Sequence, residues 1–240
     1  MIDTHAHLGD DAREVLERAR AAGVTRVIDV ATTLAAARES LARADREEGV
    51  YACIGVHPHE AAAPGDLEEL RGLLAHPRAV AVGETGLDYF RDYAPRDAQQ
   101  LVFEAQLTLA RELGKPVVVH TRAADDDTRE QLLAHDGPVV LHCFSSPPLL
   151  DAALARGWWV SFAGNVTFKN AYELRAAARR VPAERLLAET DSPYLAPQPV
   201  RGRRNEPAYV AHTYDLLADL HGEEIRAQIV RNAEELFSLA

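Results

Sequence analysis

The feature that most constrains the fold is a regular alternation of two kinds of segment along the chain. Short apolar, often β-branched runs such as residues 116–120 alternate with amphipathic stretches such as residues 96–113. Strands that alternate with helices form βαβ units and a parallel sheet, and continuous apolar runs are typical of strands buried on both faces. Eight strand signals, each followed by a helix, predict an α/β fold of the (β/α)₈ TIM-barrel type.

The predicted elements follow one another without a linker or a change in composition, so we expect one domain over residues 1–240. The predicted strands are residues 1–5, 26–30, 50–55, 79–83, 116–120, 139–142, 158–162 and 186–190. The predicted helices are residues 11–22, 34–45, 66–75, 96–113, 127–134, 147–156, 172–180, 207–220 and 223–239, the last being an extra C-terminal helix. Asp66 is a suitable N-cap, Gly114 a suitable helix stop, and residues 193–207 form a long loop after the eighth strand.

Composition narrows the class of protein. A chain of 240 residues has the size of one α/β barrel. Its only cysteines, Cys53 and Cys143, exclude a disulfide framework and favour a reducing compartment, so we expect a cytoplasmic protein. No apolar run has the length of a membrane span, and candidate chemistry as early as His5 argues against a cleaved leader. A net charge of -11 argues against a tight non-specific grip on duplex nucleic acid.

Histidines and carboxylates recur at one position, the carboxyl end of a predicted strand. The metal-ligand candidates are His5, His7, Glu84, His120, His142 and Asp191. The active site of a TIM barrel is built at that end, so side chains far apart in sequence converge there. Imidazole and carboxylate are ligands for divalent cations, and a carboxylate such as Glu84 is suited to bridge two of them. Asp191 is also placed to orient an attacking water, whereas strand alternation turns Glu189 away from the site.

Substrate contacts are expected further out. His57 follows the third strand and either contacts a substrate phosphate or is exposed. Arg122 lies two residues beyond His120, on the same side, where a guanidinium can bind phosphate oxygens, the alternative being a surface salt bridge. Arg203 belongs to the basic run of residues 201–204, which contacts the substrate backbone or is a solvated loop. Asp88 and Asn165 could only shape the rim.

These motifs together resemble the TatD family of metal-dependent deoxyribonucleases, over essentially the whole chain. The resemblance rests on His5-x-His7, Gly55-Val56-His57-Pro58, Gly83-Glu84-Thr85-Gly86-Leu87-Asp88-Tyr89, His120-x-Arg122, His142-Cys143-Phe144-Ser145, Glu189-Thr190-Asp191-Ser192-Pro193 and residues 201–207. It implies an amidohydrolase-like TIM barrel that hydrolyses DNA phosphodiesters with one or two divalent cations. It further implies that His5, His7, Glu84 and Asp191 hold one cation, and that Glu84, His120 and His142 hold the second.

Two positions depart from the family pattern. Ser146 stands where the family has glycine after His142-Cys143-Phe144-Ser145, and Ala123-Ala124 follows Arg122 where an acidic residue is common. Both departures bear on substrate preference more than on metal binding.

We therefore expect a phosphodiesterase with two divalent metal ions (Mg, Mn or Zn), with Glu84 and Asp191 as catalytic residues. Its expected partner is DNA, which we expect it to degrade as a 3′→5′ exonuclease acting on single-strand ends. The alternative is a metal-dependent hydrolase of a small-molecule ester, lactone or amide, since barrels host many chemistries. A third hypothesis is a non-enzymatic binding protein with a remnant site, against which the intact ligand set argues. No nucleotide-binding glycine motif occurs, and the oligomeric state stays open, with a monomer compatible.

Overall fold

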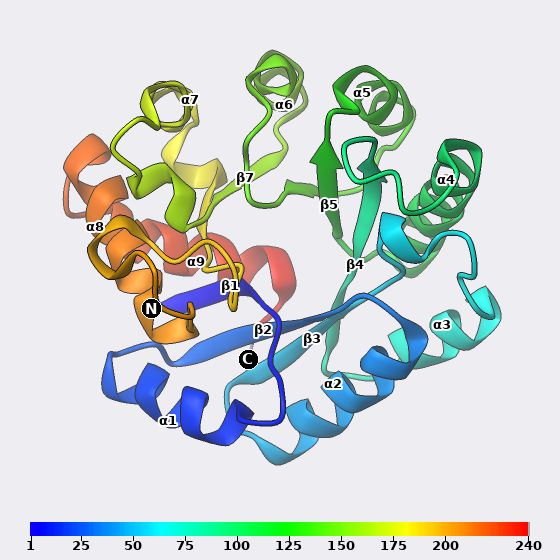
Figure 1. Cartoon of the computed structure of the whole chain (residues 1–240), viewed down its shortest axis with the longest axis horizontal. Coiled ribbons are helices and arrows are strands. Elements are labelled where there is room, and N and C mark those ends of the chain that lie inside the picture. The colour runs from blue at the N-terminus through cyan, green and yellow to red at the C-terminus, as the bar shows by residue number, and fades with distance from the viewer. Residues whose placement is uncertain (240) are drawn as a thin grey trace.

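Eight parallel strands, each hydrogen-bonded to the next in chain order, form the centre of the protein (Figure 1). The structure, a computed structural model, describes residues 1–239. The strands are β1 (Ile2–Ala6), β2 (Arg26–Ala31), β3 (Val50–Ile54), β4 (Ala79–Asp88), β5 (Val117–Arg122), β6 (Val139–Leu141), β7 (Trp159–Phe162) and β8 (Leu186–Ala188). Every neighbouring pair is parallel, as the alternation of strands and helices predicts.

The sheet closes into a barrel where the segment after β8 meets β1. The amide of Asp191 donates to the carbonyl of His5 (2.9 Å), and the amide of His7 donates to the carbonyl of Ser192 (2.7 Å). Ala6 and Ser192 form a parallel bridge. The prediction of a (β/α)₈ TIM barrel is confirmed.

Helices surround the strands on the outside of the barrel (Figure 1). They are α1 (Ala12–Ala21), α2 (Leu34–Arg46), α3 (Leu67–Leu74), α4 (Arg96–Leu113), α5 (Asp125–Leu133), α6 (Leu150–Arg156), α7 (Tyr172–Arg180), α8 (Val210–His221) and α9 (Ile225–Phe237). Short 3₁₀ turns cover Pro58–Glu60, Pro147–Leu149, Gly164–Thr167, Ala183–Arg185, Gln198–Val200 and Pro207–Tyr209. Within residues 1–239, none of these helices combines the length and the apolar character that a bilayer crossing requires.

Local signals in the sequence fix several helix ends. The side chain of Asp66 accepts a hydrogen bond from the amide of Glu68 at the start of α3, and Gly114 ends α4 in the left-handed conformation at φ 62°, both as predicted. Helix α6 begins at Leu150 rather than at Pro147, because the two prolines before it form a 3₁₀ turn.

Strand β4 is longer than its predicted five residues and continues to Asp88. Its additional residues pair with β5, Gly86 with His120 and Asp88 with Arg122. Gly86 permits this, since its φ is 136° and a Cβ there would lie 2.0 Å from the carbonyl oxygen of His120. Glu84 therefore lies inside β4, between Val82 and Thr85, where the register of the pairing with β5 shifts.

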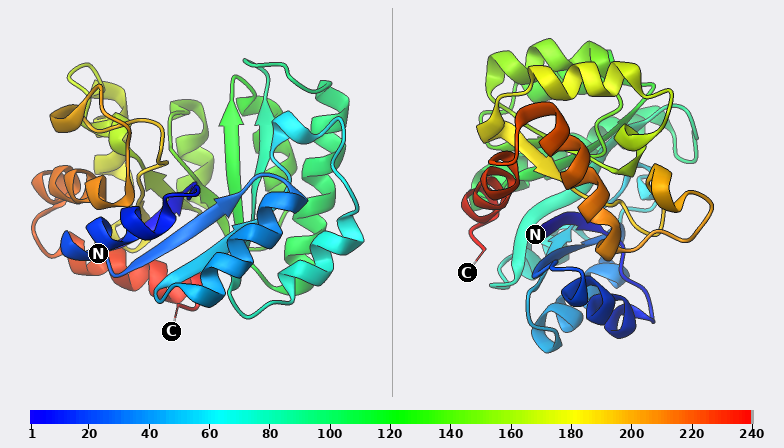
Figure 2. Two further views of the ribbon diagram at one scale, coloured as in Figure 1. Left: turned by 60° about the horizontal axis from the view of Figure 1, so that its bottom comes forward. Right: turned by 90° about the vertical axis from the view of Figure 1, so that its left-hand side faces the viewer.

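Two apolar clusters stabilise the barrel. Alternate strand residues such as Val117 and Val119 belong to a large cluster with the outer helices, whereas Val118 belongs to a second cluster. That second cluster joins strand residues to Ala233 and Phe237 of α9. Figure 2 shows α9 lying across the end of the barrel at which the strands begin. The extra C-terminal helix thus closes the amino end, and the opposite end is left for the polar side chains.

Candidate metal centre

Glu84 lies at the centre of the polar cluster at the carboxyl end of the barrel. Its side chain is buried, and five imidazoles surround its two carboxylate oxygens. Oε1 lies near His120 Nδ1 (2.8 Å), His142 Nε2 (2.9 Å) and His57 Nε2 (3.5 Å), and Oε2 near His5 Nε2 (3.5 Å) and His7 Nε2 (3.7 Å). One carboxylate of β4 therefore joins side chains from β1, β5 and the segments after β1, β3 and β6.

Asp191 approaches the same cluster from the segment after β8, beside β1. Its Oδ1 lies 3.5 Å from His7 Nε2 and 4.0 Å from His5 Nε2. The structure thus brings together all six side chains that the sequence nominated as metal ligands. Asp3 supports this arrangement from β1, because its carboxyl group accepts hydrogen bonds from the amide (2.8 Å) and the hydroxyl (2.6 Å) of Thr190. Burial raises the pKa of Asp3 to about 8, although these hydrogen bonds act to lower it.

His7 is oriented by the neighbouring strand. Its Nδ1 lies 2.9 Å from the carbonyl oxygen of Val30, which leaves Nε2 facing Glu84 and Asp191. Such a backbone partner fixes the tautomer of a metal-binding histidine. Burial alone lowers the pKa of His7, but the hydrogen bond with Asp191 and the charge of Glu84 outweigh it and raise the pKa to about 9.

The donor set fits divalent cations. His5 is fully buried, yet neither of its ring nitrogens has a hydrogen-bond partner, and the buried Nε2 of His120 also has none. An unpartnered buried nitrogen is costly, and a cation would satisfy it. Glu84 supplies the negative charge: burial raises its pKa, but the charges of His142 and His57 and hydrogen bonds from His120 and His142 hold it well below the usual range. Imidazoles that give up their protons to a metal, together with an ionised carboxylate, are the ligand set of zinc and similar metals.

Three groups of side chains in the described part of the chain have donor atoms close enough to share a cation. They are His5, His7 and Glu84; His57, Glu84 and His120; and His5, His142 and Glu189. The first two groups share Glu84, which is the geometry expected of a bridging carboxylate.

His57 lies deeper than the sequence suggested. We expected it in the loop mouth, in contact with substrate or exposed, but it is only 8% exposed and the exposed alternative is wrong. Its Nδ1 accepts a hydrogen bond from the amide of His59, so Nε2 is directed at Glu84. His142 directly follows β6, whereas His57 lies three residues beyond the end of β3, so its depth depends on the path of the intervening loop.

Glu189 is directed into the ligand set rather than away from it. Its Oε1 accepts a hydrogen bond from the amide of Cys143 (2.7 Å) and lies 3.0 Å from His142 Nδ1. Strand alternation did not apply, because β8 ends at Ala188 and Glu189 lies beyond it. Glu189 holds His142 from behind, so that Nε2 of the ring faces Glu84.

Asp88 is a second supporting carboxylate that the sequence left at the rim. Its Oδ2 lies 2.8 Å from His59 Nε2 and 3.4 Å from His120 Nε2. Its Oδ1 accepts hydrogen bonds from the amides of Phe90 and Arg91. Burial opposes ionisation, but the nearby His120 ring and hydrogen bonds from the amide of Arg91 and from His59 lower the pKa of Asp88 well below its usual range. Asp88 therefore joins two histidines to the loop after β4.

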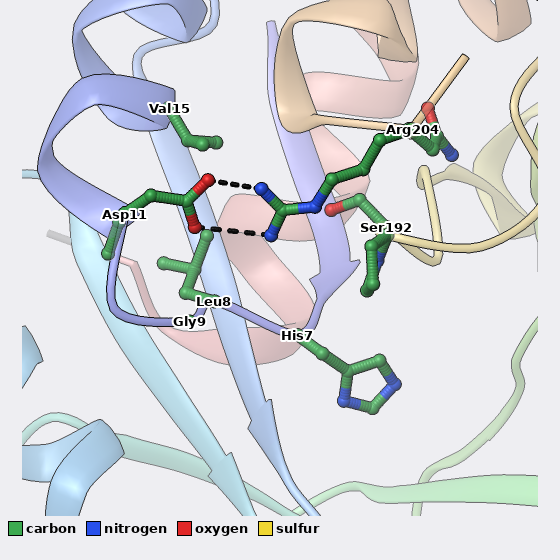
Figure 3. Close-up of a pocket in the computed structure, with 10 residues that line it drawn as sticks. His7, Leu8, Gly9, Asp11, Val15, Ser192 and Arg204 are labelled. Atoms are coloured by element: carbon green, nitrogen blue, oxygen red, sulfur yellow. Dashed lines mark hydrogen bonds and ion pairs between the residues drawn. The ribbon is translucent and has the colours of Figure 1, made fainter.

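The arginines nominated for substrate binding lie at the outer edge of the site. Arg122 is exposed, and its guanidinium lies 4.0 Å above the ring of Phe90 instead of in a salt bridge. Arg203 is also exposed and has no side-chain partner among residues 1–239. Arg204 is occupied, because it pairs with Asp11 across a small pocket beside His7 (Figure 3).

Comparison with known proteins agrees with this arrangement. The sequence model of the family described as TatD related DNase matches residues 2–238. The "uncharacterized metal-dependent hydrolase TatD" of Mycobacterium tuberculosis (strain ATCC 25618 / H37Rv) is 42% identical over 263 residues, covering 100% of this chain and 98% of the relative. The "3′-5′ ssDNA/RNA exonuclease TatD" of Klebsiella pneumoniae (strain 342) is 37% identical, covering 98% and 95%.

A solved structure shows the same fold. The crystal structure of YJJV, a TatD homolog from Escherichia coli K12, superposes with a TM-score of 0.93 at 31% identity, over 100% of this chain and 98% of the other. Together with the full-length sequence match, this likeness assigns the chain: it belongs to the TatD-related DNase family.

Proposed function

We propose that this protein is a divalent-metal-dependent phosphodiesterase that hydrolyses DNA as a 3′→5′ exonuclease on single-strand ends. The observation that carries the proposal is the buried carboxylate of Glu84 among five imidazoles, beside a fully buried His5 whose ring nitrogens have no partner. Membership in a DNase family supports nucleic acid as the substrate. The name of the Klebsiella relative supports single strands and 3′→5′ polarity.

The ligand assignment is part of this proposal. His5, His7, Glu84 and Asp191 would hold one cation, and Glu84, His120 and His142 the second, with His57 close to the same oxygen of Glu84. When bound, divalent cations lower the pKa of a water molecule and offset the charge that develops on a phosphate. Glu189 and the carbonyl of Val30 hold His142 and His7 with Nε2 facing inward.

The remaining steps belong to side chains of the chain itself. Asp191 orients the attacking water and accepts its proton, which its position beside His7 allows. A bond forms between the water oxygen and phosphorus, and the bond from phosphorus to the leaving sugar oxygen breaks. Arg122 and Arg203, both exposed at the edge of the site, bind non-bridging phosphate oxygens. The chain carries a net negative charge, which disfavours many contacts with phosphates. It therefore favours the end of a single strand, where few phosphate contacts are needed, and not a long duplex.

The cysteines and the extent of the barrel bear on the compartment of the protein and on its number of domains. Cys53 and Cys143 are both free thiols, which supports a reducing compartment, and we propose the cytoplasm. The barrel and the family match span residues 2–238, which supports one domain.

A digestion assay with end-labelled oligonucleotides tests the function. Single-stranded DNA, duplex DNA and RNA are incubated with the protein and Mg²⁺, Mn²⁺ or Zn²⁺ in turn. We expect stepwise shortening of single-stranded DNA from its 3′ end, abolished in Glu84→Ala and unchanged in Glu104→Ala, which alters an exposed glutamate of α4. Circular dichroism checks that both variants fold.

Three results would contradict the proposal. Metal-dependent turnover of small esters, lactones or amides without any degradation of DNA, and without competition by inorganic phosphate, would favour the small-molecule hydrolase. An active Glu84→Ala variant would overturn the role of Glu84. A purified protein that binds no metal and turns over no ester would favour a remnant site.

A further inference from the structure

Exposed aromatic side chains gather at the end of the barrel that carries the metal centre. Among residues 1–239, six large hydrophobic side chains are exposed, and four of them are aromatic: Phe90, Tyr93, Tyr172 and Tyr194, between 61% and 72% exposed. All four follow the carboxyl end of a strand, β4, β7 or β8. The two others, Leu101 and Leu133, lie on the outer helices α4 and α5. Exposed aromatic side chains that gather at one end of a protein, beside a polar cluster, point to a binding surface.

Two of these rings lie on the β4 side of the centre and are linked to it. Tyr93 meets His59 edge-on with 4.8 Å between ring centroids, and His59 is hydrogen-bonded to Asp88. The guanidinium of Arg122 covers one face of Phe90 at 4.0 Å, yet the Phe90 side chain remains 61% exposed. Asp88 also accepts a hydrogen bond from the amide of Phe90. The loop that carries both rings is therefore hydrogen-bonded to a residue that contacts the metal centre.

The third ring lies on the β8 side. Tyr194 meets His7 edge-on with 6.1 Å between ring centroids. Its backbone is fixed, since its amide donates to the carbonyl of Asp191 (2.9 Å) and its carbonyl accepts from Asn205 Nδ2 (2.5 Å). In a barrel of eight strands, β4 and β8 are four positions apart, so these rings face the metal centre from opposite sides.

The chemistry of the rings indicates what they would bind. An exposed aromatic ring binds a flat π-system most favourably, because the two faces can stack. Nucleobases stack on aromatic side chains whatever the sequence of the nucleic acid. Arg122 beside Phe90 adds a positive charge for the phosphate that accompanies each base. In a duplex the bases are paired and stacked on one another, so their faces are not available. A small aliphatic ester would leave all three rings in water.

We propose that Phe90 and Tyr93 on one side, and Tyr194 on the other, form two base-stacking platforms that hold the last nucleotides of a single strand across the metal centre. This inference rests on the proposed phosphodiesterase function and adds the residues that select single-stranded ends. The rings position substrate and take no part in the chemistry.

The test compares two oligonucleotides of equal length and charge. One is an ordinary single strand, and the other carries abasic tetrahydrofuran residues at its two 3′-terminal positions. KM and kcat are measured for the wild-type protein, for Phe90→Ala, Tyr93→Ala and Tyr194→Ala, for the ring-preserving Tyr194→Phe, and for Leu101→Ala as an exposed-apolar control on α4.

Stacking on an aromatic side chain corresponds to about 5- to 150-fold in affinity per base. The abasic strand lacks two bases, so for the wild-type protein we expect KM on it to rise by at least this factor. Each alanine variant raises KM on the ordinary strand and loses part of the difference between the two strands. Tyr194→Phe, which keeps the ring, retains that difference, and Leu101→Ala behaves as the wild-type protein.

A binding measurement gives a second readout that does not depend on turnover. In the Glu84→Gln background, 2-aminopurine at the penultimate 3′ position is expected to lose fluorescence on binding and to keep it when Phe90 and Tyr194 are replaced by alanine. If the wild-type protein degrades the ordinary strand but all variants retain its KM and its quenching, the stacking inference is wrong and the phosphodiesterase stands. If the wild-type protein degrades neither strand, the proposed function itself fails.

Discussion

Replacing Glu189 by glutamine isolates the effect of one charge behind the metal centre. The carboxylate is buried, accepts the amide of Cys143 at 2.7 Å and lies 3.0 Å from His142 Nδ1. Glutamine has the same shape and can accept both hydrogen bonds through its own Oε1. Only the negative charge is removed, so any change in metal affinity reports the polarisation of His142.

The expected change in metal affinity follows from the hydrogen bond between Glu189 and His142. A hydrogen bond to a charged group contributes about 1.5–3 kcal/mol and a neutral one about 0.5–1.5 kcal/mol. The difference of about 1.4 kcal/mol corresponds to a tenfold change in affinity, at the lower end of the roughly 10- to 100-fold seen for such supporting residues. Burial lowers the pKa of His142, but the charges of Glu84 and Glu189 outweigh it and raise it well above its usual value. Removing one of the two charges also changes the competition between metal and protons.

The assay is the dissociation constant for Zn²⁺ or Mn²⁺, measured by competition with a chromophoric chelator. Long-range ¹⁵N–¹H spectra of the histidines report in parallel which ring nitrogen of His142 carries the proton. We expect about tenfold weaker binding in Glu189→Gln and wild-type binding in the control Glu104→Gln. Glu189→Ala should also lose about 1–3 kcal/mol of stability, because the amide of Cys143 is left unpaired. An unchanged dissociation constant and an unchanged tautomer in Glu189→Gln would refute the reasoning.

Three further perturbations test the scaffold and the centre. Gln106→Ala leaves the amide and carbonyl of Val56 without their side-chain partners (2.8 and 2.9 Å), and we expect a loss of about 2–4 kcal/mol in urea unfolding; an unchanged midpoint would contradict this. Arg43→Ala removes the cation that pairs with the buried carboxylate of Asp29, which then keeps the hydrogen bond from the amide of Leu8. We expect a loss of about 3–5 kcal/mol, partly recovered when Asp29→Asn is added, and no recovery would exclude the charge as the cause. Chelation of the metal-loaded protein should lower its calorimetric unfolding midpoint, by the equivalent of about 2.7 kcal/mol when free metal had been 100 times the dissociation constant; an unaffected midpoint would indicate that the histidine cluster binds no metal.

The alternation of apolar runs and helices was enough to predict the barrel, because a parallel strand needs burial on both faces and a helical crossover. It was also enough to bring His5, His120 and Asp191 to one end, since every strand of such a barrel points the same way. The lengths of the strands were harder to predict from the sequence. Glu84 lies in the middle of β4 rather than at its end, because pairing with β5 continues through Gly86, a residue that the sequence alone marks as a strand breaker.

The supporting residues could not be predicted for a different reason. The orientation of Glu189 was inferred from strand alternation, which holds only while a strand continues, and β8 ends one residue earlier. The depth of His57 and the exposure of Phe90 and Tyr194 depend on how loops from β3, β4 and β8 meet in space. Local sequence patterns contain no information on such long-range packing.

Closure of the barrel between β1 and the segment after β8 has a consequence for biosynthesis. The hydrogen bonds from Thr190 to Asp3 join residues 187 positions apart, and the neighbouring backbone bonds at His5 and Asp191 complete the ligand cluster. At about 5–20 residues per second, the first strand leaves the ribosome roughly 10–40 seconds before the segment that completes its site. A nascent chain therefore carries the histidines of β1 exposed until the segment after β8 emerges, and only then can it gain a full-affinity metal centre.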